Sequence, residues 1–236
     1  MTQENSFPIL RAVKSKFLSI DGDTGKMNSW GVGLYGTQQY GKVYVDGNLG
    51  YAHHSLDSNR MTALGRVANA DLSFNQLSAK VATGYRINLN DKGTSVLTPL
   101  LSLEYGHLNQ SAYTETGAGA LNLNVDSQTC NRTRGSLGLR YNTMLKRGAI
   151  FFYPELMGAV NIQSMGNTDT MARYEGDTTG YTFTTPGVNV PNTTYTMGAN
   201  LRLVPAKNIE VQIGGRYEGG SNLSSQVGEI RGTWSF

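Results

Sequence analysis

The sequence predicts an all-β fold, an antiparallel up-and-down β-barrel that spans a membrane. Three observations lead to this prediction. Apolar and polar residues alternate, the segments that join the alternating stretches are in turn short and long, and one parity of the strands carries many charges. A period of two is that of a β-strand, whose successive side chains point to opposite faces. In a barrel strand one face contacts lipid and the other faces an aqueous lumen.

The alternation is clearest in the segment 225–236. One parity holds Ile230, Gly232, Trp234 and Phe236, and the other holds Glu229, Arg231, Thr233 and Ser235. A half-buried strand of a soluble protein can show this pattern, but it rarely finishes a chain on an aromatic residue. A transmembrane barrel strand presents one such face to lipid and the other to a wet lumen.

The composition favours strands and excludes a helical membrane protein. Only 39% of the 236 residues are hydrophobic, and no run approaches the roughly 20 apolar residues that a spanning helix needs. Glycine and tyrosine are frequent, with 29 and 13 residues, whereas there are only 6 prolines, as is typical of strands and tight turns. Lys and Arg number 20 against 17 Asp and Glu, and they are scattered, so we expect no nucleic-acid partner.

Two further features bear on the compartment. Cys130 is the single cysteine, so we expect an unpaired loop thiol and no intrachain disulfide. No signal peptide is visible, because Met1–Asn5 is polar and Phe7–Leu10 is too short for an apolar core. The sequence is therefore expected to be either cytoplasmic or a piece of a longer precursor.

Nine segments alternate strongly enough to predict strands. In 43–51, for example, an apolar row that includes Leu49 and Tyr51 lies opposite Asp46 and Asn48, which is the pattern of a barrel wall. A tenth strand is possible at 11–18. The nine predicted strands are 29–40, 43–51, 77–87, 97–106, 134–142, 152–161, 195–203, 209–218 and 225–236.

The predicted connections alternate in length. Those at 41–42, 88–95, 146–148 and 205–208 are short, and the segments 53–72, 107–132 and 163–192 between them are long. Outer-membrane barrels have short periplasmic turns and longer external loops. The rhythm therefore places Phe236, and the strand ends near Tyr40, Ile87, Leu145 and Val204, on the periplasmic side.

The inward parity of these strands carries charged residues. A dry sandwich core could not hold them, since burying an unpaired charge costs several kcal/mol. The alternative is a soluble protein with these charges outside and the aliphatic residues inside, against which the loop rhythm and the terminal aromatic argue. The residues predicted to face the lumen are Lys80, Arg86, Glu104, Arg134, Arg140, Glu155, Arg202, Glu210, Arg216, Glu218, Glu229 and Arg231.

Histidines offer the nearest approach to catalytic or metal-binding chemistry. His53 and His54 are adjacent, and Asp57 is the only near candidate for a further ligand, so we expect an exposed rim and no metal site. A serine hydrolase that uses His53, His54 or His107 stays open, although no Gly-x-Ser-x-Gly nucleophile motif is present.

The segment 113–125, Tyr-Thr-Glu-Thr-Gly-Ala-Gly-Ala-Leu-Asn-Leu-Asn-Val, resembles a motif of the autotransporter (type V secretion) translocator β-domain. The resemblance covers about residues 30–236. Shorter matches support it, namely Gly33-Leu34-Tyr35-Gly36, Tyr44–Tyr51, Gly84-Tyr85-Arg86, Leu97-Thr98-Pro99 and Pro154-Glu155.

The resemblance implies a twelve-strand barrel in the bacterial outer membrane that anchors an N-terminal passenger and helps to export it. It implies no enzymatic activity and no cofactor. It also implies contacts with lipid and with the barrel-assembly machinery, for which Glu229, Ile230, Trp234 and Phe236 match the C-terminal assembly signal. The chain departs from that signal at Arg231, where Gly is usual, and at Gly232, where a hydrophobic residue is usual.

The front of the chain departs further, because the family's passenger, linker helix and first two strands have no counterpart. Residues 1–28 are expected to be the remnant of an earlier strand and an external loop, and 29–236 the barrel domain. Either ten strands close, or the missing strands come from elsewhere, or the chain is a fragment that does not insert. A small pore or surface-loop barrel without a secretion role is the alternative function, and an outer-membrane hydrolase is a third.

Overall fold

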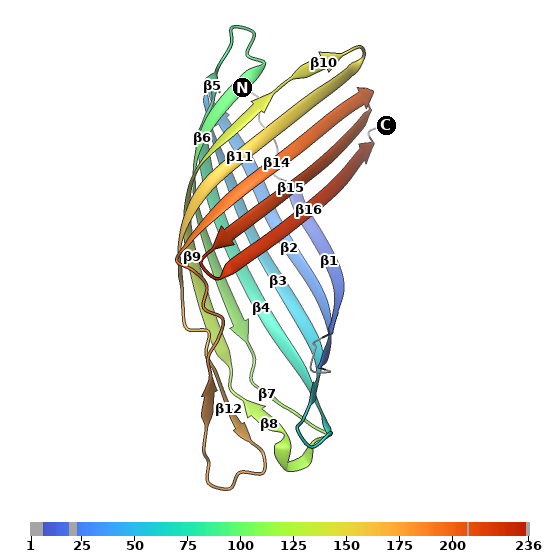
Figure 1. The fold of residues 1–236 in the computed structure, drawn as a ribbon, viewed down its shortest axis with the longest axis vertical. Helices are drawn as coiled ribbons and strands as arrows, with labels where there is room; N and C mark the ends of the chain where they lie inside the picture. The colour runs from blue at the N-terminus through green and yellow to red at the C-terminus, as the bar shows by residue number, and fades with distance from the viewer. Residues whose placement is uncertain (1–6, 19–22, 207, 235–236) are drawn as a thin grey trace.

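The computed structural model describes residues 7–18, 23–206 and 208–234, which form a strongly curved antiparallel sheet (Figure 1). Neighbours in the sheet follow the chain order, so the topology is up-and-down. Its ten main strands are β1 (Phe7–Leu18), β2 (Thr24–Tyr40), β3 (Val43–Met61), β4 (Val67–Tyr85), β6 (Ser95–Gln110), β9 (Gln128–Thr143), β11 (Ile150–Met165), β14 (Thr193–Ala206), β15 (Ile209–Gly220) and β16 (Leu223–Trp234).

The short strands lie at the two ends of the sheet. At one end, β5 (Ile87–Asn88) extends the pairing onto β6, and β10 (Leu145–Arg147) pairs with β11. At the other end a separate four-stranded sheet, called the external sheet below, forms in the order β13 (Phe183–Thr185), β12 (Thr170–Tyr174), β8 (Leu123–Val125) and β7 (Tyr113–Thr114). A single turn of 3-10 helix, η1 (Gly119–Leu121), precedes β8.

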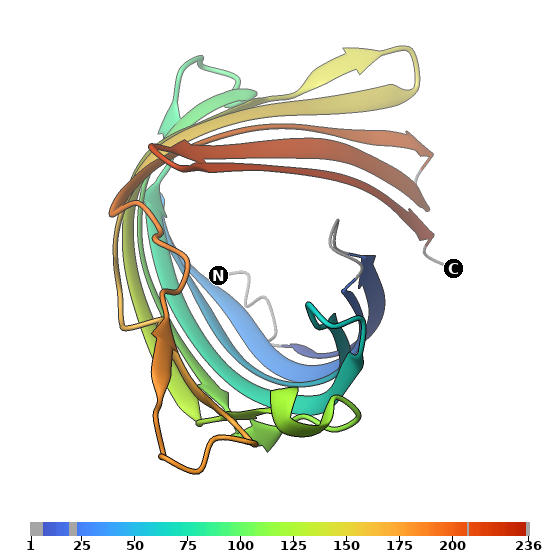
Figure 2. The ribbon, with the colours of Figure 1, turned by 60° about the horizontal axis from the view of Figure 1, so that its bottom comes forward.

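All nine predicted strands are present, and the tenth is present as β1. The register of β1 runs from Phe7 opposite Tyr35 to Leu18 opposite Thr24, so β1 belongs to the same sheet as the strands that follow. The main sheet, called the wall below, is open among the described residues, because β1 pairs only with β2 and β16 only with β15. Figure 2 shows the gap between these two strands.

The connections differ in length between the two ends, as predicted. The short turns between β2 and β3, β4 and β6, and β9 and β11 each contain a glycine with a positive φ, at Gly41, Gly93 and Gly148. A positive φ strains residues with a side chain, which is why these tight turns require glycine. In Figure 1 these turns lie at the same end as the C-terminal end of β16.

The predicted long loop 53–72 is wrong, because β3 and β4 continue through it and are joined only by 62–66. Thr62 and Arg66 close this turn, with the Thr62 amide donating to the Arg66 carbonyl at 2.8 Å. In this part of β3 and β4 the apolar side chains lie on the concave face and the charged ones on the convex face, the reverse of the rest of the sheet. Leu56 pairs with Leu72 on the concave side, which is polar elsewhere, whereas Asp57 pairs with Asp71 on the convex side. The reversal hides the strand from a search for one continuous apolar face.

The sheet carries its apolar residues on the outside. Leu137 is 67% exposed and Ile230 is 80% exposed, whereas polar residues such as Thr98, Asn161 and Thr194 are buried. The soluble alternative, with aliphatic residues inside, is therefore contradicted. No helix within the described ranges is long and apolar enough to cross a membrane.

Candidate functional site: a charged concave face, an external sheet and an apolar convex face

An ion pair between distant strands defines the concave face of the sheet. Arg134 on β9 and Glu218 on β15 lie 2.9 Å apart, although β11 and β14 run between their strands. Two side chains can meet across two intervening strands only on the inside of the curve. Both are nearly buried, with 13% and 14% of their side chains exposed. Such a pair is stabilising only if its hydrogen bonds are complete.

Further hydrogen bonds complete this inner network. Glu218 Oε1 also accepts from the Thr194 hydroxyl at 2.9 Å. The side-chain amide of Asn161 on β11 donates to Thr194 Oγ1 at 3.1 Å and to Thr196 Oγ1 at 2.9 Å. Four neighbouring strands, β9 to β15, are thereby tied together on their inner side by polar groups.

Ion pairs continue along the same face in both directions. Glu104 on β6 lies 2.7 Å from Arg132 and 3.8 Å from Lys80. Towards the short turns, Arg202 lies 3.2 Å from Glu210, and its guanidinium stacks 4.1 Å over the ring of Tyr153. Opposite charges are thus interleaved along the wall, so the face offers polar contacts without one dominant sign of charge.

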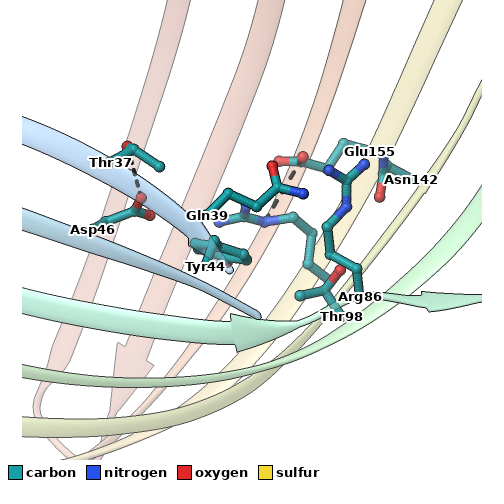
Figure 3. Close-up of a pocket in the computed structure, with 9 residues that line it drawn as sticks. Thr37, Gln39, Tyr44, Asp46, Arg86, Thr98, Asn142 and Glu155 are labelled. Carbon is teal, nitrogen blue, oxygen red and sulfur yellow. Dashed lines mark hydrogen bonds and ion pairs between the residues drawn. The ribbon is translucent and has the colours of Figure 1, made fainter. Parts of the chain in front are cut away.

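A cavity of about 340 Å³ lies on this face near the short turns (Figure 3). Arg140 and Glu155 face each other within it, with Arg140 Nε 3.8 Å from Glu155 Oε2. Asp46 accepts a hydrogen bond from Thr37 at 2.8 Å. The lining residues are Thr37, Gln39, Tyr44, Asp46, Arg86, Thr98, Arg140, Asn142 and Glu155.

The structure brings together eight of the twelve residues predicted to face the lumen, as the pairs above. The other four, Arg86, Arg216, Glu229 and Arg231, make no ion pair within the part of the chain that is described. Arg132 is missing from the residues predicted to face the lumen, because the predicted strand begins at residue 134, whereas β9 begins at Gln128.

The motif in 113–125 builds the external sheet around a buried carboxylate. Glu115 is 5% exposed and holds Arg60 of β3 in a bidentate pair, with Nε to Oε1 at 2.8 Å and Nη2 to Oε2 at 2.6 Å. Glu115 Oε2 also accepts from the Leu123 amide, and Arg60 Nη2 donates to the Leu121 carbonyl. The hydrogen bond to Glu115 raises the pKa of Arg60 above its usual value, so Arg60 stays charged.

The glycines of the motif let the chain pass close to the edge of β4. Thr116 exchanges two backbone hydrogen bonds with Asn69, at a part of β4 that β6 no longer covers. Gly117 has a φ of +96°, and a Cβ there would come within 2.7 Å of the Val67 carbonyl oxygen. Ala118, which follows, is fully buried. The first Gly-Ala step of the motif therefore reflects close packing against β4.

The two long connections interlock through Asn122. Its side chain donates to Glu175 at 2.7 Å and accepts from the Ala118 amide at 2.8 Å. Its backbone carbonyl accepts from the Glu175 amide at 2.8 Å. The long segments predicted at 107–132 and 163–192 thus both contribute strands to one small sheet. Burial in this sheet raises the pKa of the Tyr113 phenol.

The histidines are dispersed among polar partners. His53 Nδ1 lies 2.9 Å from Asn75 Oδ1, His54 Nδ1 lies 2.7 Å from Ser29 Oγ, and His107 Nδ1 lies 2.7 Å from Asn131 Oδ1. No group of three His, Cys, Asp or Glu residues suited to a metal was found among the described residues. Cys130 is a free thiol but lies within β9, which corrects its predicted place in a loop.

Two belts of aromatic residues follow the convex face. In the upper belt, Tyr51 lies on β3 and Tyr195 lies five strands away on β14. The residue of β3 that is level with Tyr195 is Val45, six residues from Tyr51. The register connects Val45 to Tyr195 through Thr83, Leu101, Leu137 and Val160. Five strands are crossed, so the belt descends about one residue per strand, as strands tilted by ~35–45° require for a constant height. The upper belt comprises Trp30, Tyr51, Tyr105, Tyr195 and Tyr217, and the lower belt Tyr40, Tyr85, Tyr141, Phe152 and Trp234.

Between the belts the convex face is aliphatic, and this combination is typical of transmembrane barrels. Residues 12–216 of the chain match the model of the autotransporter β-domain. The chain belongs to the autotransporter β-domain family. As such it is an outer-membrane protein of the barrel type, and β-domains of this family are typically without enzymatic activity.

Individual relatives agree with this assignment. Over 121 residues the chain is 28% identical to an extracellular serine protease of Serratia marcescens, an alignment that covers 50% of this chain and 11% of that protein. The translocator domain of the autotransporter NalP from Neisseria meningitidis matches with a TM-score of 0.76 at 18% identity, over 100% of this chain and 77% of the other. The β-domain of BrkA from Bordetella matches with a TM-score of 0.59 at 15% identity, over 98% and 91%. These two likenesses concern the fold.

Proposed function

We propose that this autotransporter β-domain anchors an N-terminal passenger in the outer membrane and provides the polar wall along which the passenger is exported. The observation that carries the proposal is the distribution of polarity. The ion pair between Arg134 and Glu218 lies inside the curve, and the exposed aliphatic residues lie outside it. A polypeptide in transit needs hydrogen-bonding partners and water, and the concave face supplies them.

The twelve residues predicted to face the lumen belong to this proposal. Their interleaved charges offer a passing chain weak, exchangeable contacts. The division of the chain at residue 28 also remains a proposal, and the continuous pairing of β1 with β2 supports a boundary before β1 more than one after it.

Lipid and the barrel-assembly machinery are the proposed partners of the wall. The lipid contact is supported by the two aromatic belts and by the exposed side chains of Ile230 and Trp234 on β16. The assembly signal is proposed to comprise Glu229, Ile230, Trp234 and Phe236, of which Phe236 lies outside the described residues. A pore without a secretion role would use the same lipid face, so only passage of a polypeptide separates the two functions.

A chain with two tags tests the proposal. A signal peptide and a passenger that carries one epitope are fused ahead of Met1. The other epitope is inserted after Gly180, in the exposed connection between β12 and β13. We expect antibodies to label both epitopes on intact cells. In the same fusion protein without Phe236, neither epitope should be labelled, because that protein would not assemble.

The outcomes separate the alternatives. Labelling of the Gly180 tag alone would identify a barrel without export and overturn the secretion role. Labelling of neither tag in the unaltered chain would contradict assembly in the outer membrane. Heat-modifiable migration on gels monitors folding in each case.

A further inference from the structure

The cavity near the short turns contains a buried, positively charged donor that lacks an acceptor. Arg140 Nε is buried and has no hydrogen-bond partner, because the carboxylate of Glu155 is 3.8 Å away, beyond hydrogen-bonding distance. Arg86, an exposed residue that lines the same cavity, has a guanidinium that makes no ion pair with any described residue. A buried donor without an acceptor costs about 1–3 kcal/mol, and more when it is charged.

The backbone of Arg86 is anchored beside the cavity. The Arg86 amide donates to the Lys42 carbonyl at 2.8 Å, which attaches this residue to the turn between β2 and β3. The ring of Tyr44 lies against Gly84, where an added Cβ would approach the ring within 2.6 Å. The cavity wall is thus closely packed on this side, and Figure 3 shows Arg86, Gln39 and Glu155 directed into the same space.

Neither carboxylate of the cavity binds the free donor. Asp46 accepts from the Thr37 hydroxyl, and Glu155 faces Arg140 from too far away to complete a hydrogen bond. A ligand that completes the cavity must therefore bring an acceptor. A carboxylate is the group that guanidinium ions bind most strongly, through paired charge-assisted hydrogen bonds.

We propose that this cavity is an acceptor site for an acidic side chain, Asp or Glu, of a polypeptide that lies against the concave face. Arg86 and Arg140 bind the carboxylate, and Gln39 and Tyr44 lie beside it. At about 340 Å³ the cavity falls at the low end of the range for ligand sites, ~300–1,000 Å³. The inference rests on the proposed function, since the passenger would supply the polypeptide.

Binding is measured directly on the folded chain in detergent micelles. The probes are a short capped peptide, acetyl-Ser-Gly-Glu-Gly-Ser-amide, and the same peptide with Gln in place of Glu. With ¹⁵N-labelled arginine, the Nε–H resonance of Arg140 reports on the buried donor. We expect this resonance to shift downfield on titration with the Glu peptide, and the Gln peptide to bind at least about tenfold more weakly.

Variants localise the site. Arg86→Gln should weaken binding of the Glu peptide at least about tenfold, and Arg86→Lys should weaken it less while preserving folding. The matched control is Arg147→Gln, which removes an exposed positive charge from β10 at the same end of the sheet and should change binding less than twofold.

Equal binding of the two peptides would overturn the proposal, as would an equal effect of Arg86→Gln and Arg147→Gln, since either result would show diffuse attraction only. Heat-modifiable migration identifies variants that have folded. The result is separable from that of the tagged passenger, because peptide binding in micelles requires neither insertion into cells nor export.

Discussion

Glu115→Gln should release the external sheet from the end of the β3–β4 hairpin while the main sheet stays folded. The substitution keeps the shape of the side chain but leaves the guanidinium of Arg60 without its carboxylate. Breaking a buried ion pair on one side costs about 3–5 kcal/mol. Because Glu115 lies in a peripheral sheet, we expect this loss to appear as local opening. Amide hydrogen exchange in 113–125 and 170–174 measures it.

The Leu123 amide is the most direct reporter, because it donates to Glu115 Oε2 at 2.8 Å. Its exchange should accelerate by at least about a hundredfold, which is what about 2.7 kcal/mol of local destabilisation gives. The control is Asp91→Asn, which removes an exposed carboxylate in the turn between β5 and β6. Unchanged protection in Glu115→Gln would contradict the role of the pair, and accelerated exchange throughout β9 and β11 would show that the effect is global.

Leu137→Arg should prevent stable insertion of the sheet into a bilayer, whereas Ser136→Arg should be tolerated. Leu137 projects from the convex face of β9, between the two aromatic belts, and is 67% exposed. An Arg on the lipid face at the bilayer midplane costs about 2–4 kcal/mol. Ser136 is its neighbour on the opposite face and lines a cavity of about 150 Å³ together with Glu104. The folded fraction in lipid vesicles, followed through urea titration, measures both variants.

The comparison is controlled by position, because the two residues are adjacent and receive the same side chain. Comparable loss of folding in both variants would indicate that β9 has no distinct lipid face. Greater loss in Ser136→Arg would indicate that the faces are assigned the wrong way round.

The wall could be predicted from the sequence because its strands keep one parity over their membrane-spanning length. Leu101, Leu103, Leu137 and Leu139 repeat every second residue, and the period of a strand follows directly from such spacing. The parity reverses beyond His53, where Leu56 turns inward and Asp57 outward. A prediction based on one continuous apolar face therefore ends the strand at this point and assigns a loop to the residues that follow.

The pairings between side chains could not be predicted from the sequence. Glu115 lies within the motif 113–125, but its partner Arg60 precedes it by 55 residues and has no motif of its own. The pair of Arg134 and Glu218 depends on how tightly the sheet curves between β9 and β15, and the curvature of the sheet has no local signature in the sequence. The interlocking of Asn122 with Glu175 likewise depends on two loops meeting in space.

A spin-label scan along β9 tests the central claim most directly, namely that the convex face contacts lipid and the concave face contacts water. In a Cys130→Ser background, single cysteines at positions 133–142 are labelled, and the chain is reconstituted in vesicles. The account predicts a period of two: labels at 133, 135, 137, 139 and 141 collide mainly with oxygen dissolved in lipid, and those at 134, 136, 138, 140 and 142 mainly with a water-soluble nickel complex. Accessibility without a period of two, or with the two parities exchanged, would contradict it.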